Sequence, residues 1–422
     1  MSFGSNDTMG DTIMKFDTMG DTIMKNGCFK QIMGIGMVVC AMTLLICGDA
    51  LSEIVLGRLR ITPELSVSET YRSNIYQTET ATKSDFVTTT RPGLRLNYQF
   101  GARHNLSLGY NAGWLSYARY SRNNYWDQRA NGLLNLNFTN GLEFILGNQF
   151  IKSVYEQMAT ISYQRAYQQN IIDTSLAYRF ADRWKAQAKY NRDALSMDHY
   201  KDRGVDYLQD LFGGVMYYRF TGRTSALVEY DHVMKNFDRN DASNSQSDNV
   251  YLGVAFDPAG KLQGEFKAGY GWKKFEHDIA NRNNSPKTWI AQGSITQNFS
   301  PYTKLSFIAS RALMDDTNFG NASYESTLAA ATFQHFFTDK IGATATVQYW
   351  LSDYLDNFTE PVTGISKQRT DKRWDLGAGL IYKVQKWLET RLEYQYINRN
   401  SNFETYSFDE NRIMFKILLS LL

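Results

Sequence analysis

The stretch Lys261-Leu-Gln-Gly-Glu-Phe-Lys-Ala-Gly-Tyr-Gly-Trp272 decides the fold. Its charged and amide side chains stand at odd positions, and its Leu, Phe, Ala, Tyr and Trp side chains stand at even positions. Successive side chains of a β-strand point to opposite faces, so this spacing predicts a strand with one polar and one apolar face.

The same alternation returns along the chain, at residues 94–100, 184–193 and 388–396. No comparable stretch keeps the 3.6-residue spacing of an amphipathic helix. The pattern therefore predicts an all-β protein.

Two kinds of turn signal separate these segments, and the two kinds alternate. Several of the tight turns contain the Gly or Asn that hairpins favour. Tight turns are predicted near Gly101-Ala102, Asn140-Gly141, Ala181-Asp182, Thr221-Gly222, Pro258-Ala259-Gly260, Ser300-Pro301, Thr338-Asp339 and Val384-Gln385. Longer polar stretches lie between them, such as Asp238–Asp248, Asp278–Ser285 and Asp356–Gln368. Eight tight turns join sixteen strands, and two end strands, roughly Leu56–Tyr71 and Phe408–Leu422, make eighteen.

An even strand number, with short turns on one side and longer loops on the other, is typical of a bacterial outer-membrane barrel. The strand segments run about 12–18 residues, whereas strands of globular proteins usually have about 5–6. We expect one transmembrane, antiparallel, up-and-down β-barrel of about 18 strands, with periplasmic turns and extracellular loops. A β-propeller, which needs four short strands per repeat, and a soluble β-sandwich are the weaker alternatives.

Composition excludes several other classes of protein. The 422 residues have a formal net charge of +2, which argues against a protein that grips nucleic acid by its phosphates. Mean hydropathy is negative, so the chain is not a bundle of membrane-spanning helices. Phe, Tyr and Trp make up 14% of the chain and gather near strand ends, where aromatic girdles of a barrel would lie.

The first 50 residues differ from the rest and contain all three cysteines. Lys25 and Lys30 precede the apolar run Ile32–Ile46, and Gly48-Asp49-Ala50 follows it, as in a secretory signal. We expect residues 1–50 to be an upstream extension plus a cleaved signal, and residues 51–422 to be a single outer-membrane barrel. A lipoprotein signal ending at Cys47 and an uncleaved anchor are the alternatives, and translation could start at Met1 or Met24.

The start of the predicted barrel carries the most specific motif. Arg60–Tyr71 leads into Ser73-Asn74-Ile75-Tyr76, and Ser84-Asp85-Phe86-Val87 is followed by Arg91-Pro92-Gly93-Leu94. In these elements the chain resembles the putative β-barrel porin 2 family, which is often encoded with exopolysaccharide export systems. The resemblance implies a barrel conduit that assists export of an exopolysaccharide.

The lumen would be the functional surface, because ionisable groups on the lipid face cost about 2–4 kcal/mol at the midplane. Alternation predicts that the following charged residues face inward: Arg95, Arg129, Glu143, Arg179, Lys185, Lys189, Asp193, Glu229, Asp231, Lys261, Glu265, Lys267, Arg373, Asp375, Glu389, Arg391 and Glu393. They could tune which solutes pass, or they could pair across the wall and only fill and rigidify the barrel. Both interpretations stay open.

A second set of candidates is aromatic. Tyr117, Tyr120, Tyr125 and Trp126 lie near a predicted loop tip and could stack on sugar rings, although interface anchoring explains most aromatic residues more simply. No nucleophile, phosphate-loop or metal-ligand motif is present, so we expect no enzyme activity, no metal and no cofactor. Calcium in the acidic stretches Asp238–Asp241 or Asp315-Asp316 is a weaker alternative to solvated loops.

These features predict a porin-like conduit in the bacterial outer membrane, and the exopolysaccharide substrate is implied only by the family resemblance. The expected partners are outer-membrane lipid, the barrel assembly machinery, a polysaccharide substrate and periplasmic export components, but not nucleic acid. The alternative is a barrel that transports nothing and serves as a structural or adhesive surface protein.

Overall fold

Eighteen long antiparallel strands close into a barrel in the computed structural model, which describes residues 53–158, 163–256, 259–280, 282–315, 323–360 and 363–420. The predicted signal, its cleavage site and the three cysteines lie outside the described residues. The predicted boundary at residue 50 therefore stays a prediction.

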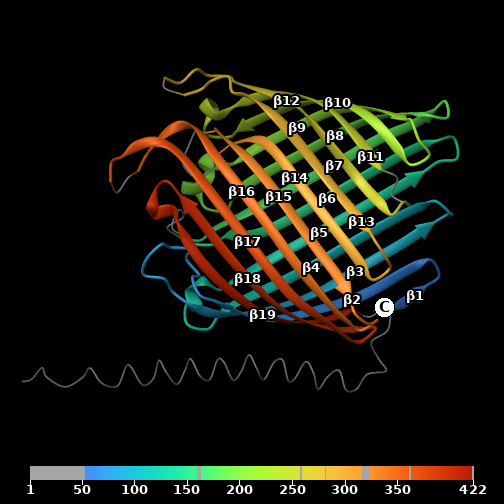
Figure 1. The fold of residues 1–422 in the computed structure, drawn as a ribbon, viewed down its shortest axis with the longest axis horizontal. Coiled ribbons are helices and arrows are strands. Elements are labelled where there is room, and N and C mark those ends of the chain that lie inside the picture. Colours follow the sequence, from blue (N-terminus) through green and yellow to red (C-terminus); the bar gives the residue numbers. More distant parts are fainter. Residues whose placement is uncertain are drawn as a thin grey trace, which may run out of the picture. The chain divides into compact units, whose positions relative to one another are not determined.

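The strands and the short 3-10 turns follow one another in a simple meander (Figure 1). The first nine long strands are β2 (Leu59–Arg72), β3 (Asp85–Phe100), β4 (His104–Tyr117), β5 (Tyr125–Asn137), β6 (Leu142–Tyr155), β7 (Arg165–Phe180), β8 (Trp184–Met197), β9 (Tyr207–Arg219) and β10 (Thr224–Phe237). The other nine are β11 (Ser245–Phe256), β12 (Leu262–Phe275), β13 (Lys287–Asn298), β14 (Thr303–Asp315), β15 (Ser323–Phe336), β16 (Ile341–Thr359), β17 (Ser366–Gln385), β18 (Leu388–Ser401) and β19 (Phe408–Ser420). A three-residue strand, β1 (Ile54–Leu56), precedes them, and the 3-10 turns are η1 (Ser121–Asn123), η2 (Tyr200–Val205), η3 (Asp241–Ser243) and η4 (Glu404–Tyr406).

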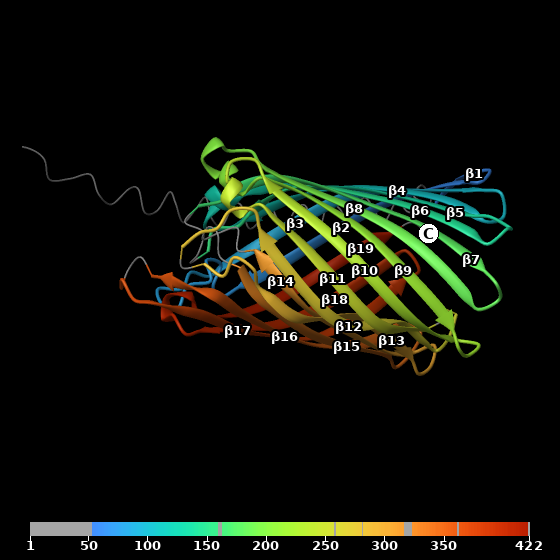
Figure 2. The same ribbon diagram turned by 90° about the horizontal axis from the view of Figure 1, so that it is seen from above.

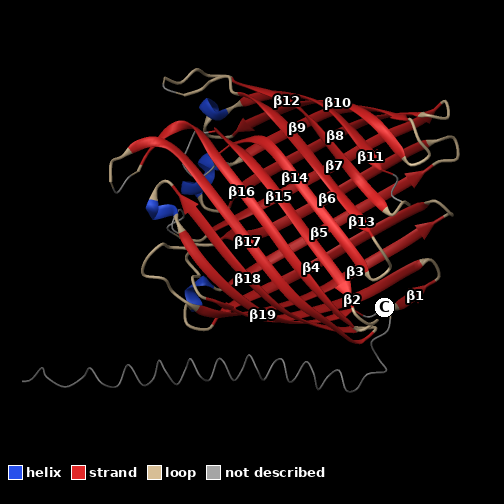
Figure 3. Cartoon of the chain, in the orientation of Figure 1, coloured by secondary structure: helices blue, strands red, loops and turns tan. Residues whose placement is uncertain are grey.

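Each long strand pairs with the next, and β19 returns to pair with β2, from Arg412 opposite Arg72 to Ser420 opposite Glu64. Closure leaves no free sheet edge. The unpaired backbone N–H and C=O groups of such an edge could not form hydrogen bonds with lipid. The tight turns lie at one end of the barrel and the longer loops at the other (Figures 1 and 2). All four 3-10 turns lie at the loop end (Figure 3). The predicted eighteen-strand meander is confirmed.

The first strand differs from the prediction, which ran it from Leu56 to Tyr71. The chain turns at Gly57, whose φ of 64° lies in the left-handed region that glycine tolerates, and β2 starts at Leu59. β1 then pairs with residues 59–61 of β2, next to the stretch of β2 that β19 covers. This short strand was not predicted, since three residues are too few to show alternation.

The last tight turn and the long loops also differ in their limits. β17 runs to Gln385 with a register shift near Lys383, so the turn falls at Lys386-Trp387 rather than at Val384-Gln385. Strands extend into stretches predicted as loops, because polar residues also fill the lumen face of a barrel strand. β11 accordingly begins at Ser245, and β16 continues to Thr359.

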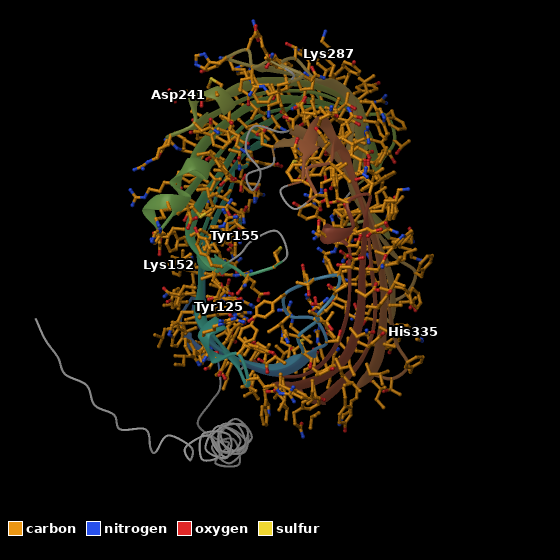
Figure 4. The ribbon with its side chains drawn as sticks, turned by 90° about the vertical axis from the view of Figure 1, so that its left-hand side faces the viewer. Tyr125, Lys152, Tyr155, Asp241, Lys287 and His335 are labelled. Atoms are coloured by element: carbon orange, nitrogen blue, oxygen red, sulfur yellow. The ribbon has the colours of Figure 1, made fainter. Side chains whose placement is uncertain are left out.

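The two faces of the wall differ as the alternation requires. Many large apolar side chains are exposed on the outer face, among them Leu94, Leu176, Leu252, Trp289 and Phe415. In a membrane barrel these side chains would contact lipid. Figure 4, viewed from the loop end, shows Tyr125 and Tyr155 on the inner side of the wall and Lys152 and His335 on the outer side. Among the described residues, no helix has the length and apolar character needed to cross a membrane.

Candidate functional site: the barrel lumen

A row of alternating charges crosses the lumen face of β8, β10 and β12. Lys189 on β8 donates a hydrogen bond to Glu229 on β10 and lies 2.9 Å from Asp231. Lys267 on β12 donates to the other oxygen of Glu229 at 2.6 Å. Only 1% of Glu229 is exposed, and a buried carboxylate requires paired charges of this kind. We call Lys189, Glu229, Asp231 and Lys267 the central charge row.

Strand β9 lies between β8 and β10, and a glycine on β9 allows side chains of β8 and β10 to contact each other. Gly213 lies directly opposite Lys189 on one side and Asp231 on the other. A Cβ atom on Gly213 would collide with both side chains. The missing side chain therefore opens the space in which the lysine and the carboxylate meet.

Residues paired directly across neighbouring strands point to the same face of the sheet. The strand pairing therefore shows which predicted residues share the lumen face with the central charge row. The predicted residues that lie on strands share this face: Arg95, Arg129, Glu143, Arg179, Lys185, Lys189, Asp193, Glu229, Asp231, Glu265, Lys267, Arg373, Asp375, Glu389, Arg391 and Glu393. Lys261 is the exception, because it lies in the exposed β11–β12 turn and not on a strand.

Most of these charges are paired with one another or with a neighbour. Fourteen of the seventeen predicted side chains make ion pairs, such as Arg373 with Asp375 at 2.7 Å and Arg95 with Glu64 at 2.7 Å. Two neutral side chains, Gln169 and Tyr207, hydrogen-bond to Asp193 instead. The lumen face is thus polar, and its side chains are linked by ion pairs and hydrogen bonds. The same charges can therefore stabilise the barrel and line a hydrated interior.

A second polar cluster fastens the β6–β7 loop to the inside of the barrel. Glu156, the first residue after β6, accepts hydrogen bonds from Arg72 at 2.8 Å, Tyr117 at 3.0 Å and Tyr125 at 3.2 Å. Arg72 also donates to the fully buried Glu410 at 2.6 Å. Burial raises the pKa of Glu156, but the charge of Arg72 and its hydrogen bond outweigh burial and hold the pKa below its usual value. The carboxylate therefore stays ionised at neutral pH and keeps the start of the loop at β2, β4 and β5.

The four aromatic candidates do not form one surface. Tyr117 is 3% exposed and is committed to Glu156, so it offers no ring face to a sugar. Tyr120 packs edge-on against Tyr76, and Tyr125 also binds Glu156. Trp126 is exposed on the outer face, where its ring lies 5.2 Å from that of Trp114. This arrangement fits loop anchoring and an interface girdle better than a glycan platform.

The upper half of the β14–β15 hairpin leaves the wall and leans into the lumen. Asp315 at the end of β14 lies 3.2 Å from Lys235 on β10 and also pairs with Lys273 on β12. Strand alternation would place Asp315 on the outer face, because its neighbour Met314 is opposite Tyr324, whose ring stacks on the lumen side with Tyr354. Asp315 reaches lumen lysines only because the hairpin bends inward.

The bend leaves a seam between β13 and β14. Their pairing stops at Ala291 opposite Arg311, although β13 itself starts at Lys287. Arg311 bridges the seam by donating hydrogen bonds to Thr327 at 2.7 Å and to Thr288 at 3.4 Å.

Sequence reasoning missed this hairpin, although a signal was present. Arg311, Asp315 and Glu325 are charged residues at positions that alternation assigns to the lipid face. Such charges are costly next to lipid, so their position indicated that this part of the wall does not face lipid.

The alternative of a metal site gains no support from the described residues, in which no three His, Cys, Asp or Glu side chains gather as metal ligands. Asp315 pairs with two lysines, Lys235 and Lys273. Asp316 lies outside the described residues. Asp231 and His232 point to opposite faces, and His232 pairs on the outside with Asp248 at 2.8 Å.

Comparison with known proteins now gives this barrel a family context. The family model described as putative beta-barrel porin 2 matches residues 54–420, which is nearly all of the described chain. A search of curated proteins found no match.

Several solved porin structures are similar to the chain at low identity. OpdK of Pseudomonas aeruginosa with vanillate is 12% identical, with a TM-score of 0.45, over 85% of this chain and 98% of that one. OpdQ of Pseudomonas aeruginosa is 12% identical, with a TM-score of 0.46, over 87% and 100%. A BenF-like porin from Pseudomonas fluorescens Pf-5 is 14% identical, with a TM-score of 0.44, over 86% and 99%.

Proposed function

The chain belongs to the putative β-barrel porin 2 family, and from this premise we propose that it forms a water-filled conduit that assists export of an exopolysaccharide across the bacterial outer membrane. The family places the chain in that membrane. Barrels of 16–18 strands are wide enough to leave an aqueous channel.

The observation that carries the proposal is the charged lumen. Lys189, Glu229 and Lys267 stand at mid-strand depth on the inner face. Ionised groups at this depth favour contact with water over contact with lipid. A polar solute could replace part of this hydration by hydrogen bonds to the same side chains.

The second candidate is a barrel that transports nothing and serves as a structural or adhesive surface protein. One observation favours it: two segments, the start of the β6–β7 loop at Glu156 and the upper β14–β15 hairpin at Asp315, occupy part of the lumen. Both segments narrow the same passage. Whether solutes pass through the opening that they leave distinguishes the two candidates.

We propose no catalytic activity, since the lumen charges are engaged in ion pairs and not arranged as a nucleophile beside a base. The proposed partners are outer-membrane lipid, the barrel assembly machinery, the polysaccharide and periplasmic export components. Nucleic acid is not among them.

Single-channel recording in planar lipid bilayers tests the conduit. We expect purified protein to give discrete conductance steps, and polysaccharide fragments in the bath to cause transient blockades. A silent bilayer would refute the conduit, provided that the same preparation shows a folded barrel by heat-modifiable gel mobility. That result would favour the structural alternative.

A further inference from the structure

The tight turns at the periplasmic end are unusually basic. Six of the eight contain Lys or Arg: Arg103, Arg183, Arg223, Lys261, Lys340 and Lys386. The same turns contain three acidic residues, Asp182, Asp257 and Asp339. We call the six basic residues the basic collar.

The opposite end has the opposite balance. The long loops contain twelve acidic residues by sequence: Glu79, Glu156, Asp198, Asp202, Asp206, Asp238, Asp241, Glu276, Asp278, Asp316, Glu360 and Glu404. They contain seven basic ones: Lys83, Arg119, Arg122, Lys201, Arg203, Arg239 and Arg282. The overall charge of +2 therefore hides a separation of charge along the barrel axis, which directs anions toward the turn end.

Part of the collar lines a cavity inside the mouth of the barrel. This cavity of about 1090 Å³ is formed by β7–β10, with contributions from β11–β14, at the turn end. Six basic side chains line it against two acidic ones. Arg183 and Arg223 of the collar are among them, together with Lys185 and Arg219.

Several of these cations are available to a ligand. Across the described part of the chain, Arg183, Lys185 and Arg223 form no ion pair with a carboxylate. Lys185 is instead held over the ring of Tyr217, with Nζ 4.3 Å from the ring centroid. Arg183 makes a long 3.5 Å contact with the hydroxyl of Tyr218, whose ring lies beside Trp184 on the outer face, so its guanidinium lies at the outer rim. These cations therefore differ from the central charge row, whose lysines are committed to Glu229.

The acidic groups of the cavity do not cancel this charge. Glu265 accepts a hydrogen bond from Tyr217 at 3.3 Å and lies 3.7 Å from Lys267. Asp182 contributes a single carboxylate to the cavity. Four basic side chains outnumber it: Arg183, Lys185, Arg219 and Arg223. The excess of fixed positive charge is thus located on one wall of the periplasmic mouth.

We infer that this cavity binds carboxylate groups of an acidic oligosaccharide entering from the periplasm, with Lys185 and Arg223 as the binding cations and Arg183 at the rim of its mouth. The sugar character rests on the proposed function, whereas the negative charge rests on the cavity itself. Tyr217 adds a ring beside Lys185, so a sugar carboxylate and a sugar face could be engaged together.

Anionic phospholipid of the inner leaflet is the competing ligand for basic residues at this level. Lipid head groups would contact the outer rim of the barrel, which Arg183 reaches, but Lys185 lies on the lumen face of β8. A soluble acidic sugar is therefore the better match for the cavity.

Calorimetric titration of the detergent-purified barrel with an oligogalacturonate tests the inference without requiring conduction. We expect binding that weakens with salt, as screening requires. In the triple variant Arg183→Gln, Lys185→Gln, Arg223→Gln, we expect affinity to fall about tenfold. The matched control removes three charges from the loop end, Arg119→Gln, Arg122→Gln, Lys201→Gln, and should bind like the wild type. A neutral dextran fragment of equal length is the probe control.

The outcomes separate this inference from the proposed conduit. Equal affinity for the oligogalacturonate and dextran, or equal losses in both triple variants, would overturn the acidic-sugar site and leave the conduit intact. Binding restricted to lipid vesicles containing anionic phospholipid would assign the collar to lipid and also overturn it. Salt-sensitive binding by a barrel that does not conduct would support the site and refute the conduit.

Discussion

Gly213 lies on β9 between Lys189 of β8 and Asp231 of β10. Because Gly213 has no side chain, those two groups can contact each other on the lumen face. The next residue, Gly214, points to the outer face, where an added Cβ would have no atom within 4 Å. Two adjacent glycines of one strand therefore have different roles. One is required by the central charge row, and the other is not.

The substitution Gly213→Ala should lower the free energy of unfolding by about 1–3 kcal/mol, because the methyl group forces Lys189 and Asp231 apart in a packed site. Gly214→Ala is the matched control and should stay within about 0.5 kcal/mol of the wild type. Urea unfolding in lipid vesicles, followed by tryptophan fluorescence, measures both. Equal stability of the two variants would contradict the role assigned to Gly213.

At the scale of elements, the β14–β15 hairpin is the segment whose position most affects the lumen. It is attached to nearby strands of the wall by Asp315, which contacts Lys235 of β10 and Lys273 of β12. Without the carboxylate, the two lysines would face each other as like charges. The hairpin would then lose its contact and move toward the wall.

We expect Asp315→Asn to increase single-channel conductance, because the lumen widens when the hairpin is released. Asp375→Asn serves as control, since Asp375 pairs with Arg373 on its own strand and fastens no second element. Planar bilayer recording at one salt concentration compares the two. If the Asp315 variant conducts like the wild type and the Asp375 variant, the hairpin does not limit the passage.

At the scale of the whole molecule, the barrel depends on the closure between its last long strand and its first. β19 covers the edge of β2 from Glu64 to Arg72, whereas β1 covers only residues 59–61. Without β19, both β18 and β2 would present unpaired backbone groups, which lipid cannot satisfy.

A chain ending at Ser407 should fail to refold into detergent micelles as a heat-modifiable band, because it lacks β19. A chain without Ile54–Leu56 should refold like the wild type, since β1 contributes three residue pairs to the sheet. Gel mobility before and after boiling reports the result, and purified protein keeps cellular assembly out of the comparison. Normal refolding of the shorter chain would mean that closure by β19 is dispensable.

The alternation of residues 261–272, together with the turn signals, was enough to predict eighteen strands, two unlike faces and an outer-membrane barrel. These features are local, because a strand's side-chain period and a hairpin's turn depend only on neighbouring residues. Lumen-side charge could be predicted for the same reason, as at Lys189 and Glu229. Even the charge difference between turns and loops is present in the sequence.

The tertiary structure decided which charges meet and which segments enter the lumen. Arg72 and Glu410 are 338 residues apart, and only the closing register of β19 on β2 brings them together. The inward bend of the β14–β15 hairpin likewise reverses the face expected for Asp315, because that face is set by where the whole hairpin lies. The period of two determines to which side of its own strand a residue points. The path of the strand through space determines which groups that residue contacts.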